Sequence, residues 1–242
     1  MKTESKRQPF IIEFTESKKY FSTRAIREEA ARRELKYGAT TINQYLYNLK
    51  IQSKVFDAGR GWYSTLSLPF KQHTAPVEQL ATQILTRFPF LKFSCWSTEQ
   101  LQGYAHHLIT RFTRFVYTDA DSMSSVAEFL KESNYDAHLN PWKEEVEKYF
   151  TPSSTAVVVR PSVTEEPADG NYATAEKMLI DLFLEKDRLY LMDGGEYNRI
   201  FRNLAFSYRI NMARLLRYSD RRKVKAAFVK KVLNDCADTI CM

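Results

Sequence analysis

Two carboxylates, Asp119 and Asp121, follow the apolar run 115–117 and are separated by a single residue. Carboxylates placed in this way at the end of a strand bind Mg²⁺ in nucleotidyltransferases. Those enzymes also need a Gly-Ser phosphate-binding turn ahead of the pair, and none precedes it here. The pair is also typical of a polar loop that caps the helix expected after Ser122. A metal-dependent nuclease or nucleotidyltransferase of a defence system, using Asp119 and Asp121, is therefore the alternative function.

Other catalytic patterns are missing from the sequence. It contains no nucleophile elbow, P-loop or His-Glu-x-x-His segment. Cys95, Cys236 and Cys241 lack metal-ligand spacing, and their odd number is typical of reduced thiols. No signal peptide is expected at the N-terminus, and no run of about eighteen apolar residues could cross a membrane. We predict a cytoplasmic protein that is not an enzyme, needs no metal or cofactor and has no membrane partner.

The segment 40–50 has side chains suited to reading DNA. Ile42, Tyr45, Leu46 and Leu49 recur with the spacing of one buried helix face. The opposite face has side chains that exchange hydrogen bonds and no carboxylate that would repel phosphate: Thr40, Thr41, Asn43, Gln44, Tyr47, Asn48 and Lys50. Asn and Gln can pair bidentately with an adenine edge. We predict a helix over 42–50, capped by Thr40 or Thr41, that enters the major groove.

A second candidate DNA contact is Arg60, which lies between Gly59 and Gly61. Residues 55–56 and 62–63 predict two short strands around this turn. At its tip, the Arg60 guanidinium can reach a phosphate or a minor groove. We therefore add Arg60 to the expected DNA-binding residues.

The elements that must position these residues form an N-terminal domain over 1–70. Helices are expected over 6–18 and 24–30, the second capped by Ser22 or Thr23. With the helix over 42–50 and the hairpin, this order predicts a winged helix–turn–helix. An alternative is a winged helix that contacts only proteins.

The remaining residues, 71–242, predict a small α/β domain with a helical C-terminal part. The proline-containing connector 69–76 is the expected boundary. Strands are expected over 90–96, 112–117, 137–139 and 155–160, between helices over 77–88, 97–107, 125–132 and 142–150. An exposed, mobile loop is expected over 161–171, and helices over 176–186, 197–208, 211–217 and 220–233, the last capped by Ser219 or Asp220. The fold class is α+β, with partner binding or oligomerisation assigned to the second domain.

Charge is distributed unevenly along the chain, whose formal net charge is +7. Residues 1–70 contain 13 Lys and Arg against 7 Asp and Glu, residues 71–185 contain 10 against 16, and residues 186–231 contain 13 against 4. A basic N-terminal domain suits a polyanion, because neutralised phosphates release counterions. The basic C-terminal helices favour either a solvated surface or a second site for a polyanion or acidic partner.

Two stretches resemble a bacterial family, the AbiE-type antitoxins of toxin–antitoxin and phage-defence loci. The segments 40–49 and 59–63 are similar to that family's winged helix and its wing. The segment 175–182 is similar to a Glu-Lys-(apolar)-Leu-(apolar)-Asp-Leu stretch of its larger domain, although Glu176 and Lys177 would simply face solvent in an unrelated amphipathic helix.

The resemblance implies an autorepressor whose C-terminal domain binds or counteracts a nucleotidyltransferase toxin. Asn43, Gln44, Tyr47 and Lys50 would then contact bases or phosphates, with Arg60 as the wing contact. We predict a non-enzymatic transcriptional regulator with double-stranded DNA and a cognate toxin as partners. Because such repressors bind paired half-sites as dimers, a homodimer on an inverted repeat is expected.

Overall fold

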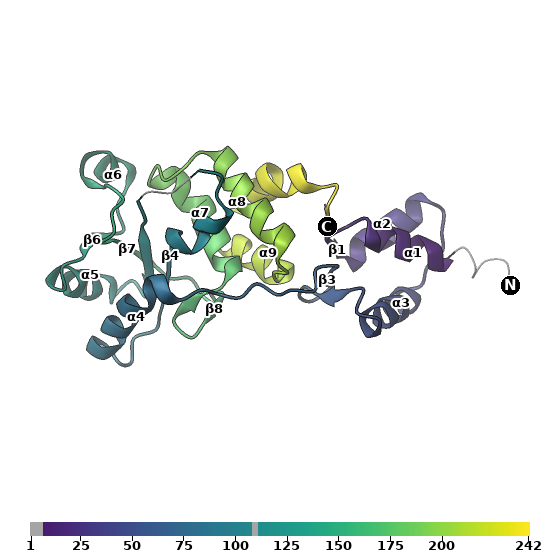
Figure 1. Cartoon of the computed structure of the whole chain (residues 1–242), viewed down its shortest axis with the longest axis horizontal. Coiled ribbons are helices and arrows are strands. Elements are labelled where there is room, and N and C mark those ends of the chain that lie inside the picture. The colour runs from purple at the N-terminus through teal and green to yellow at the C-terminus, as the bar shows by residue number, and fades with distance from the viewer. Residues whose placement is uncertain (1–6, 108–110) are drawn as a thin grey trace. The chain divides into compact units, whose positions relative to one another are not determined.

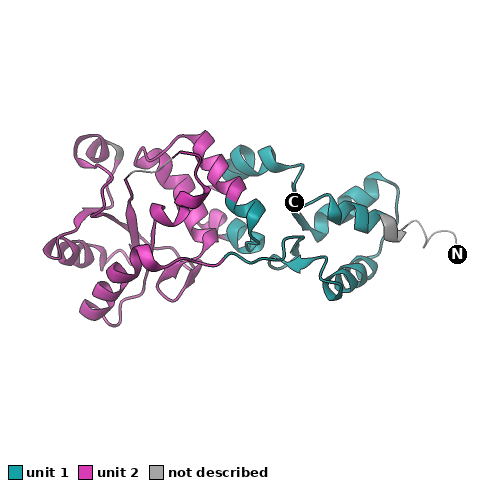
Figure 2. Cartoon of the chain, in the orientation of Figure 1, with its two compact units in different colours: residues 1–70, 204–217, 225–242 teal, residues 71–203, 218–224 magenta. Residues whose placement is uncertain are grey.

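A computed structural model of the chain describes residues 7–107 and 111–242. Two compact units are present: unit 1 comprises residues 1–70, 204–217 and 225–242, and unit 2 comprises residues 71–203 and 218–224 (Figure 2). Both combine helices with a mixed sheet, so the predicted α+β class is confirmed. Residues 204–217 and 225–242, which were predicted to belong to the second domain, cluster with the first seventy residues.

Unit 1 begins with three helices, α1 (Arg7–Glu16), α2 (Thr23–Arg32) and α3 (Ala39–Ile51), which gather around a common core (Figure 1). The helix expected over 6–18 is shorter, and Lys6 lies outside the described residues. The Ser22 hydroxyl accepts a hydrogen bond from the Ala25 amide at 3.0 Å, which confirms the predicted cap of α2. The core combines apolar side chains of all three helices: Phe10, Ile11, Phe14, Ala25, Ile26, Ala30, Ile42, Leu46 and Leu49.

The sheet of unit 1 joins strands that are far apart in the sequence. Its order is β10 (Ile240–Cys241), β1 (Tyr20–Ser22), β3 (Trp62–Ser64) and β2 (Phe56–Asp57). β10 is parallel to β1, whereas β3 is antiparallel to both β1 and β2. The hairpin strands were expected, but β1 and β10 were not. β1 and β10 have too few residues for a periodic pattern, and no turn marks them in the sequence as Gly59 and Gly61 mark the hairpin.

The C-terminal helices differ from the prediction in where they break. The structure has α8 (Gly194–Ser207), α9 (Met212–Arg221), α10 (Lys225–Phe228), a π-helical turn (Val229–Leu233) and a 3₁₀ turn (Asn234–Cys236). The prediction that Ser219 or Asp220 caps a new helix is wrong, since both residues lie inside α9. Lys223 ends the helix with a φ of +57°, and the amides of Lys223 and Val224 donate to the carbonyls of Asp220 and Ser219. This pattern is a Schellman motif.

Unit 2 is built on a six-stranded sheet in the order β6-β7-β5-β4-β9-β8. The strands are β4 (Phe93–Ser97), β5 (Arg114–Thr118), β6 (Asp136–Leu139), β7 (Ala156–Pro161), β8 (Ala168–Asp169) and β9 (Tyr172–Ala173). β7 is parallel to β5 and β6, whereas β4 is antiparallel to β5. The four longer strands were predicted. The loop expected over 161–171 is shorter, because β8 and β9 form a small hairpin at the sheet edge.

Alternation along the strands separates the two faces of this sheet. Cys95, Val116 and Val157 share an apolar core with α4 (Ala75–Arg87) and α5 (Met123–Glu132). On the other face α7 (Ala175–Arg188) lies over Tyr117 of β5. The remaining elements are a 3₁₀ helix (Thr98–Tyr104) and α6 (Lys143–Tyr149). This 3₁₀ helix, shorter than the helix predicted over 97–107, opens with a capping box in which the Ser97 amide donates to Gln100 Oε1 at 2.8 Å. Within residues 7–107 and 111–242, no helix has the length and apolar character needed to span a bilayer.

Candidate functional site

The first candidate site is the outward surface of α3, which the helix presents because its other surface is buried. Ile42, Leu46 and Leu49 are all 5% exposed or less. The helix begins one turn earlier than predicted, with Gly38 as its N-cap and no side-chain cap. The prediction that Thr40 or Thr41 caps α3 is therefore wrong, since both lie in its first turn. Each keeps a hydroxyl group on the surface of that turn.

The residues predicted to contact DNA share this surface. Exposed side chains are those of Thr40, Asn43, Gln44, Tyr47, Asn48 and Lys50, and Thr41 is half-buried. Ile51, which the sequence analysis missed, is 66% exposed and extends the same surface. We call these eight residues the α3 face. Asn48 Oδ1 accepts a hydrogen bond from Gln44 Nε2 at 3.3 Å, and no Asp or Glu occurs in α3.

Arg60 lies in the turn between β2 and β3. Its side chain is exposed, and it is flanked by Gly59 at φ +101° and Gly61 at φ +75°. Lys50 of α3 forms an ion pair with Asp57 of β2 at 2.5 Å, so the charge of Lys50 is already partnered. Both cations of the predicted set, Lys50 and Arg60, are therefore exposed, but Lys50 already has a carboxylate partner.

Packing inside unit 1 holds this turn tightly. A Cβ built on Gly59 would lie 2.1 Å from Asn211 Oδ1 and 2.7 Å from Ala213 Cβ, at the start of α9. The same Asn211 oxygen accepts the Arg214 amide at 2.9 Å and caps α9. Gly59 is thus required both by its backbone conformation and by its contact with α9. The position of Arg60 depends on C-terminal residues that the sequence analysis did not associate with the hairpin.

The two units differ strongly in charge. Unit 1 contains 19 Lys and Arg against 9 Asp and Glu, a formal charge of +10. Unit 2 contains 17 against 20, a formal charge of −3. The basic C-terminal segments 204–217 and 225–242 therefore add to the charge of the unit that contains α3. A unit with this charge attracts polyanions through its long-range field.

The carboxylates of the alternative function lie in an exposed loop after β5. Asp119 Oδ1 accepts the Ser122 amide at 2.9 Å, as expected for a capping loop. Hydrogen bonds from Ser122 hold the pKa of Asp119 below its ordinary value. Across the two described ranges, no group of three or more His, Cys, Asp or Glu side chains is arranged to hold a metal ion.

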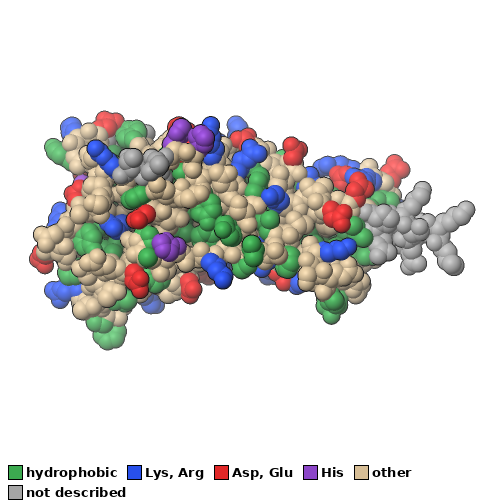
Figure 3. Space-filling model, in the orientation of Figure 1, with side chains coloured by type: hydrophobic (Ala, Val, Ile, Leu, Met, Phe, Trp, Pro, Cys, Tyr) green, Lys and Arg blue, Asp and Glu red, His purple; other side chains and the backbone are tan. Residues whose placement is uncertain are grey.

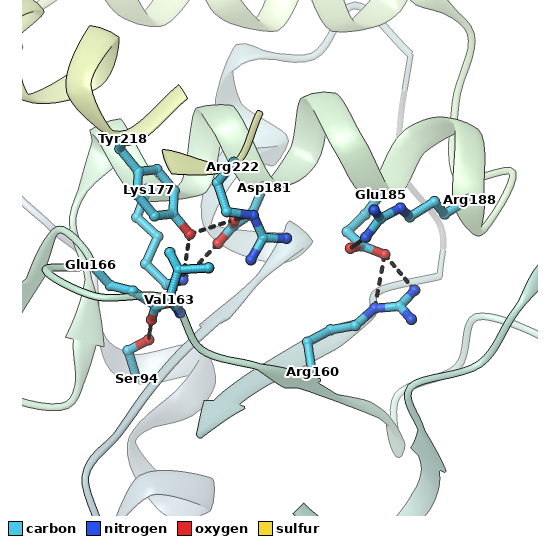
Figure 4. A network of polar contacts seen from close by, with 10 residues as sticks. All are labelled: Ser94, Arg160, Val163, Glu166, Lys177, Asp181, Glu185, Arg188, Tyr218 and Arg222. Atoms are coloured by element: carbon cyan, nitrogen blue, oxygen red, sulfur yellow. Dashed lines mark hydrogen bonds and ion pairs between the residues drawn. The ribbon is translucent and has the colours of Figure 1, made fainter. Parts of the chain in front are cut away.

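The second notable group is a set of charges buried between α7 and the sheet of unit 2 (Figure 4). Ser94, Tyr117 and Arg160 are neighbours across β4, β5 and β7, so they form one row on the face opposite α4 and α5. Lys177, Asp181 and Glu185 follow one another every four residues and form one stripe of α7. The row and the stripe meet, which brings charged side chains into the interior.

Lys177 is at the centre of this group and is fully buried. Its Nζ lies 2.9 Å from Glu166 Oε2, Asp181 Oδ2 and Tyr218 Oη, and 3.5 Å from the centre of the Tyr117 ring. Three polar partners match the three N–H donors of an ammonium group. Ser94 donates to the same Glu166 oxygen at 3.0 Å. We call Glu166, Lys177, Asp181, Tyr218 and Arg222 the buried ionic network.

Two residues from the C-terminal part of unit 2 complete the network. Tyr218 donates a hydrogen bond to Asp181 Oδ1 at 2.8 Å, and Arg222 Nε lies 3.8 Å from the same oxygen. Burial, followed by the charge of Asp181, raises the pKa of Tyr117 and of Tyr218 well above the ordinary value. Both phenols therefore stay neutral beside the carboxylates.

A second buried pair lies further along α7. Arg160 donates from Nε and Nη2 to Glu185 Oε2 at 3.2 and 2.6 Å, and both side chains are at most 4% exposed. The side chains of Lys177, Asp181 and Glu185 have no exposed surface at which a substrate could bind. The network therefore holds α7, residues 218–222 and loop 161–167 on the sheet.

Burial decides three points that the sequence left as expectations or alternatives. Glu176 and Lys177 do not face solvent, since they are 6% and 0% exposed. Loop 161–171 is not wholly exposed, because the Glu166 side chain is 9% exposed. Arg222 is not a solvated surface residue, since its side chain is 8% exposed. The sequence contained one sign that α7 is buried. The helix is apolar on most of its circumference, and such helices are buried.

Comparison with known proteins identifies the family of the chain but gives no function. Curated proteins include none that matches the sequence. The model of a family of unknown function, DUF6577, matches residues 41–238. This match includes α3 from Thr41 onward, the β2–β3 hairpin and the whole of unit 2. The chain therefore belongs to the DUF6577 family.

Proposed function

We propose that this chain is a DNA-binding transcriptional regulator whose residues 1–70 form a winged helix–turn–helix. The order α1, β1, α2, α3 and the β2–β3 hairpin supports this fold, in which the third helix reads the major groove and the hairpin is the wing. One observation carries the proposal. The α3 face exposes hydrogen-bonding side chains without a carboxylate, in a unit with a formal charge of +10.

The resemblance to AbiE-type antitoxins supports a more specific role, repression of its own operon in the bacterial cytoplasm. A homodimer would bind an inverted repeat, because each winged helix reads one half-site. Unit 2 would bind or counteract a cognate nucleotidyltransferase toxin. Its surface supports partner binding, since Phe90, Trp142 and Tyr149 are 98%, 75% and 75% exposed. Exposed aromatic side chains of this kind are enriched at protein–protein interfaces.

The direct test is binding of the full chain to a labelled duplex from upstream of its own gene. Affinity should fall steeply as salt rises, and binding should survive an excess of scrambled duplex. Gln44→Ala should weaken specific binding by at least fivefold, because it removes a base-edge contact. Gln79→Ala, an exposed helical glutamine of unit 2, is the matched control and should leave binding unchanged.

The possible results separate the functions. Equal affinity for specific and scrambled duplexes would reduce the proposal to non-specific DNA association. No binding to any duplex at low salt would overturn it. Mg²⁺-dependent cleavage or nucleotide transfer that Asp119→Asn abolishes would instead establish the alternative enzyme.

The antitoxin role has a separate test where a nucleotidyltransferase gene adjoins this one. Co-expression of the chain should relieve growth arrest by that enzyme, and Trp142→Ala with Tyr149→Ala should weaken the relief while leaving DNA binding unchanged. Arrest that persists in the presence of the wild-type chain would contradict the role.

A further inference from the structure

The outermost ridge of α3 combines one amide with two large apolar side chains. At 100° per residue, Thr40, Gln44, Tyr47 and Ile51 fall on one line along the helix. This line is opposite the buried Ile42, Leu46 and Leu49. Tyr47 is 58% exposed and Ile51 is 66% exposed, and hydrophobic side chains reach the surface over α3 (Figure 3). Asn43 and Asn48 flank this ridge on its two sides.

These side-chain types match one kind of base pair. An Asn or Gln amide can donate to and accept from the adenine edge in the major groove. An apolar side chain gains most against the thymine methyl group, which guanine and cytosine lack. The ridge therefore offers a partner for each half of an A·T pair.

The side chains that read guanine are scarce on the same surface. Guanine is usually read by Arg or Lys, which donate to its O6 and N7 atoms. α3 contains no Arg, and its single Lys50 is paired with Asp57 at 2.5 Å. Cytosine is read by Glu or Asp, and α3 contains neither. The α3 face is thus poorly equipped for G·C pairs.

We propose that the α3 face selects A·T pairs in the major groove of a B-form duplex, with Tyr47 and Ile51 packed against thymine methyl groups. This inference rests on the proposed DNA-binding function and names the sequence class that the same surface reads. The amides of Gln44 and Asn43 read adenine edges. Duplex DNA is the occupant that fits, because the face contains no carboxylate and belongs to a unit with a formal charge of +10.

The test has two stages, both with the full chain. First, duplexes that bind are selected from a random pool at moderate salt and sequenced. Positions shared by the bound duplexes should be predominantly A·T. Second, each thymine of the selected core is replaced by uracil, which removes only the methyl group. Wild-type affinity should fall about fourfold for each methyl group that packs against α3.

A double variant tests whether Tyr47 and Ile51 make the contacts with the methyl groups. The double variant Tyr47→Ala with Ile51→Ala should bind thymine and uracil duplexes equally. Both side chains are more than half exposed, so the fold should tolerate the change. Leu85→Ala, an exposed apolar position on a helix of unit 2, is the control and should retain the full methyl preference.

Each outcome decides a different claim. A selected core rich in G·C, or a wild-type affinity that ignores uracil, would overturn this inference and leave DNA binding intact. A methyl preference that persists in the double variant would remove Tyr47 and Ile51 from the contact and overturn their assignment. Failure to enrich any duplex would overturn the proposed function, and this inference with it.

Discussion

The polar and charged side chains of a helix point outward in unit 1 and inward in unit 2. In unit 1, α3 buries only apolar side chains and turns its polar side chains outward. In unit 2, α7 turns Lys177, Asp181 and Glu185 inward, where each finds partners on the sheet or on residues 218–222. Outward polar groups are free to meet a ligand, whereas inward charges must be neutralised within the fold. α3 thus keeps its polar side chains available at the surface, whereas α7 uses its charged side chains to hold unit 2 together.

The largest expected effect comes from breaking the buried ionic network. Lys177→Met should lower the free energy of unfolding of the chain by about 3–5 kcal/mol, because Asp181 and Glu166 would stay buried without their cation. Denaturant unfolding measures the loss. Adding Asp181→Asn to Lys177→Met should recover part of it.

Lys131 of α5 is exposed, so Lys131→Met is the matched control. It should change the free energy of unfolding by no more than about 0.5 kcal/mol. If Lys177→Met matched this control, the network would not stabilise unit 2 and the comparison between the units would fail.

Alkaline titration offers a second way to probe the interior of unit 2. Burial raises the pKa of Tyr117, Tyr197 and Tyr218 in the folded chain above the unfolded value of about 10. Their contribution to stability is complete below that pH and is lost as pH rises above it. In this range, each of the three tyrosines should lower the free energy of unfolding by about 1.4 kcal/mol per pH unit. Tyrosinate absorbance should therefore show a late step that coincides with unfolding, and Tyr117→Phe should make that step smaller. Ionisation of all tyrosines in the intact fold would contradict the prediction.

In unit 1, the packing that holds the turn between β2 and β3 is tested at Gly59. Gly59→Ala should lower the free energy of unfolding by about 1–3 kcal/mol, because φ is +101° and the new Cβ would overlap Asn211 and Ala213. Gly103→Ala is the control, since a Cβ there meets no atom within 4 Å. Equal stability of the two variants would show that α9 does not hold the turn.

The smallest expected effect concerns a single phosphate. Arg60→Ala should reduce the slope of log affinity against log salt by about 0.9, because one counterion fewer is released on binding. Arg111→Ala, an exposed arginine of unit 2, should leave the slope unchanged. The slope is measured with the duplex used to test the proposed function. An Arg60→Ala slope equal to that of the wild-type chain would remove Arg60 from the proposed DNA contact.

Long periodic segments were predictable from the sequence. The first three helices of unit 1 and the four longer strands of unit 2 follow apolar patterns that reflect which face is buried, so local residue order was sufficient. The surface of α3 could also be predicted for the same reason. Ile51 was missed because an apolar residue at the end of a helix gives no sign of whether it is buried.

Contacts between distant segments depend on tertiary packing and could not be predicted from local sequence. β10 pairs with β1, although about 220 residues separate them. Asn211 and Ala213 pack against Gly59, and Tyr218 and Arg222 reach Asp181. Charged residues such as Lys177 are usually exposed, so the residue types alone favoured an exposed position for them. Their burial follows from partners supplied by three other parts of the chain, which local sequence cannot specify. The longer elements and the carboxylate-free surface of α3 follow from local sequence, while the buried network depends on long-range packing.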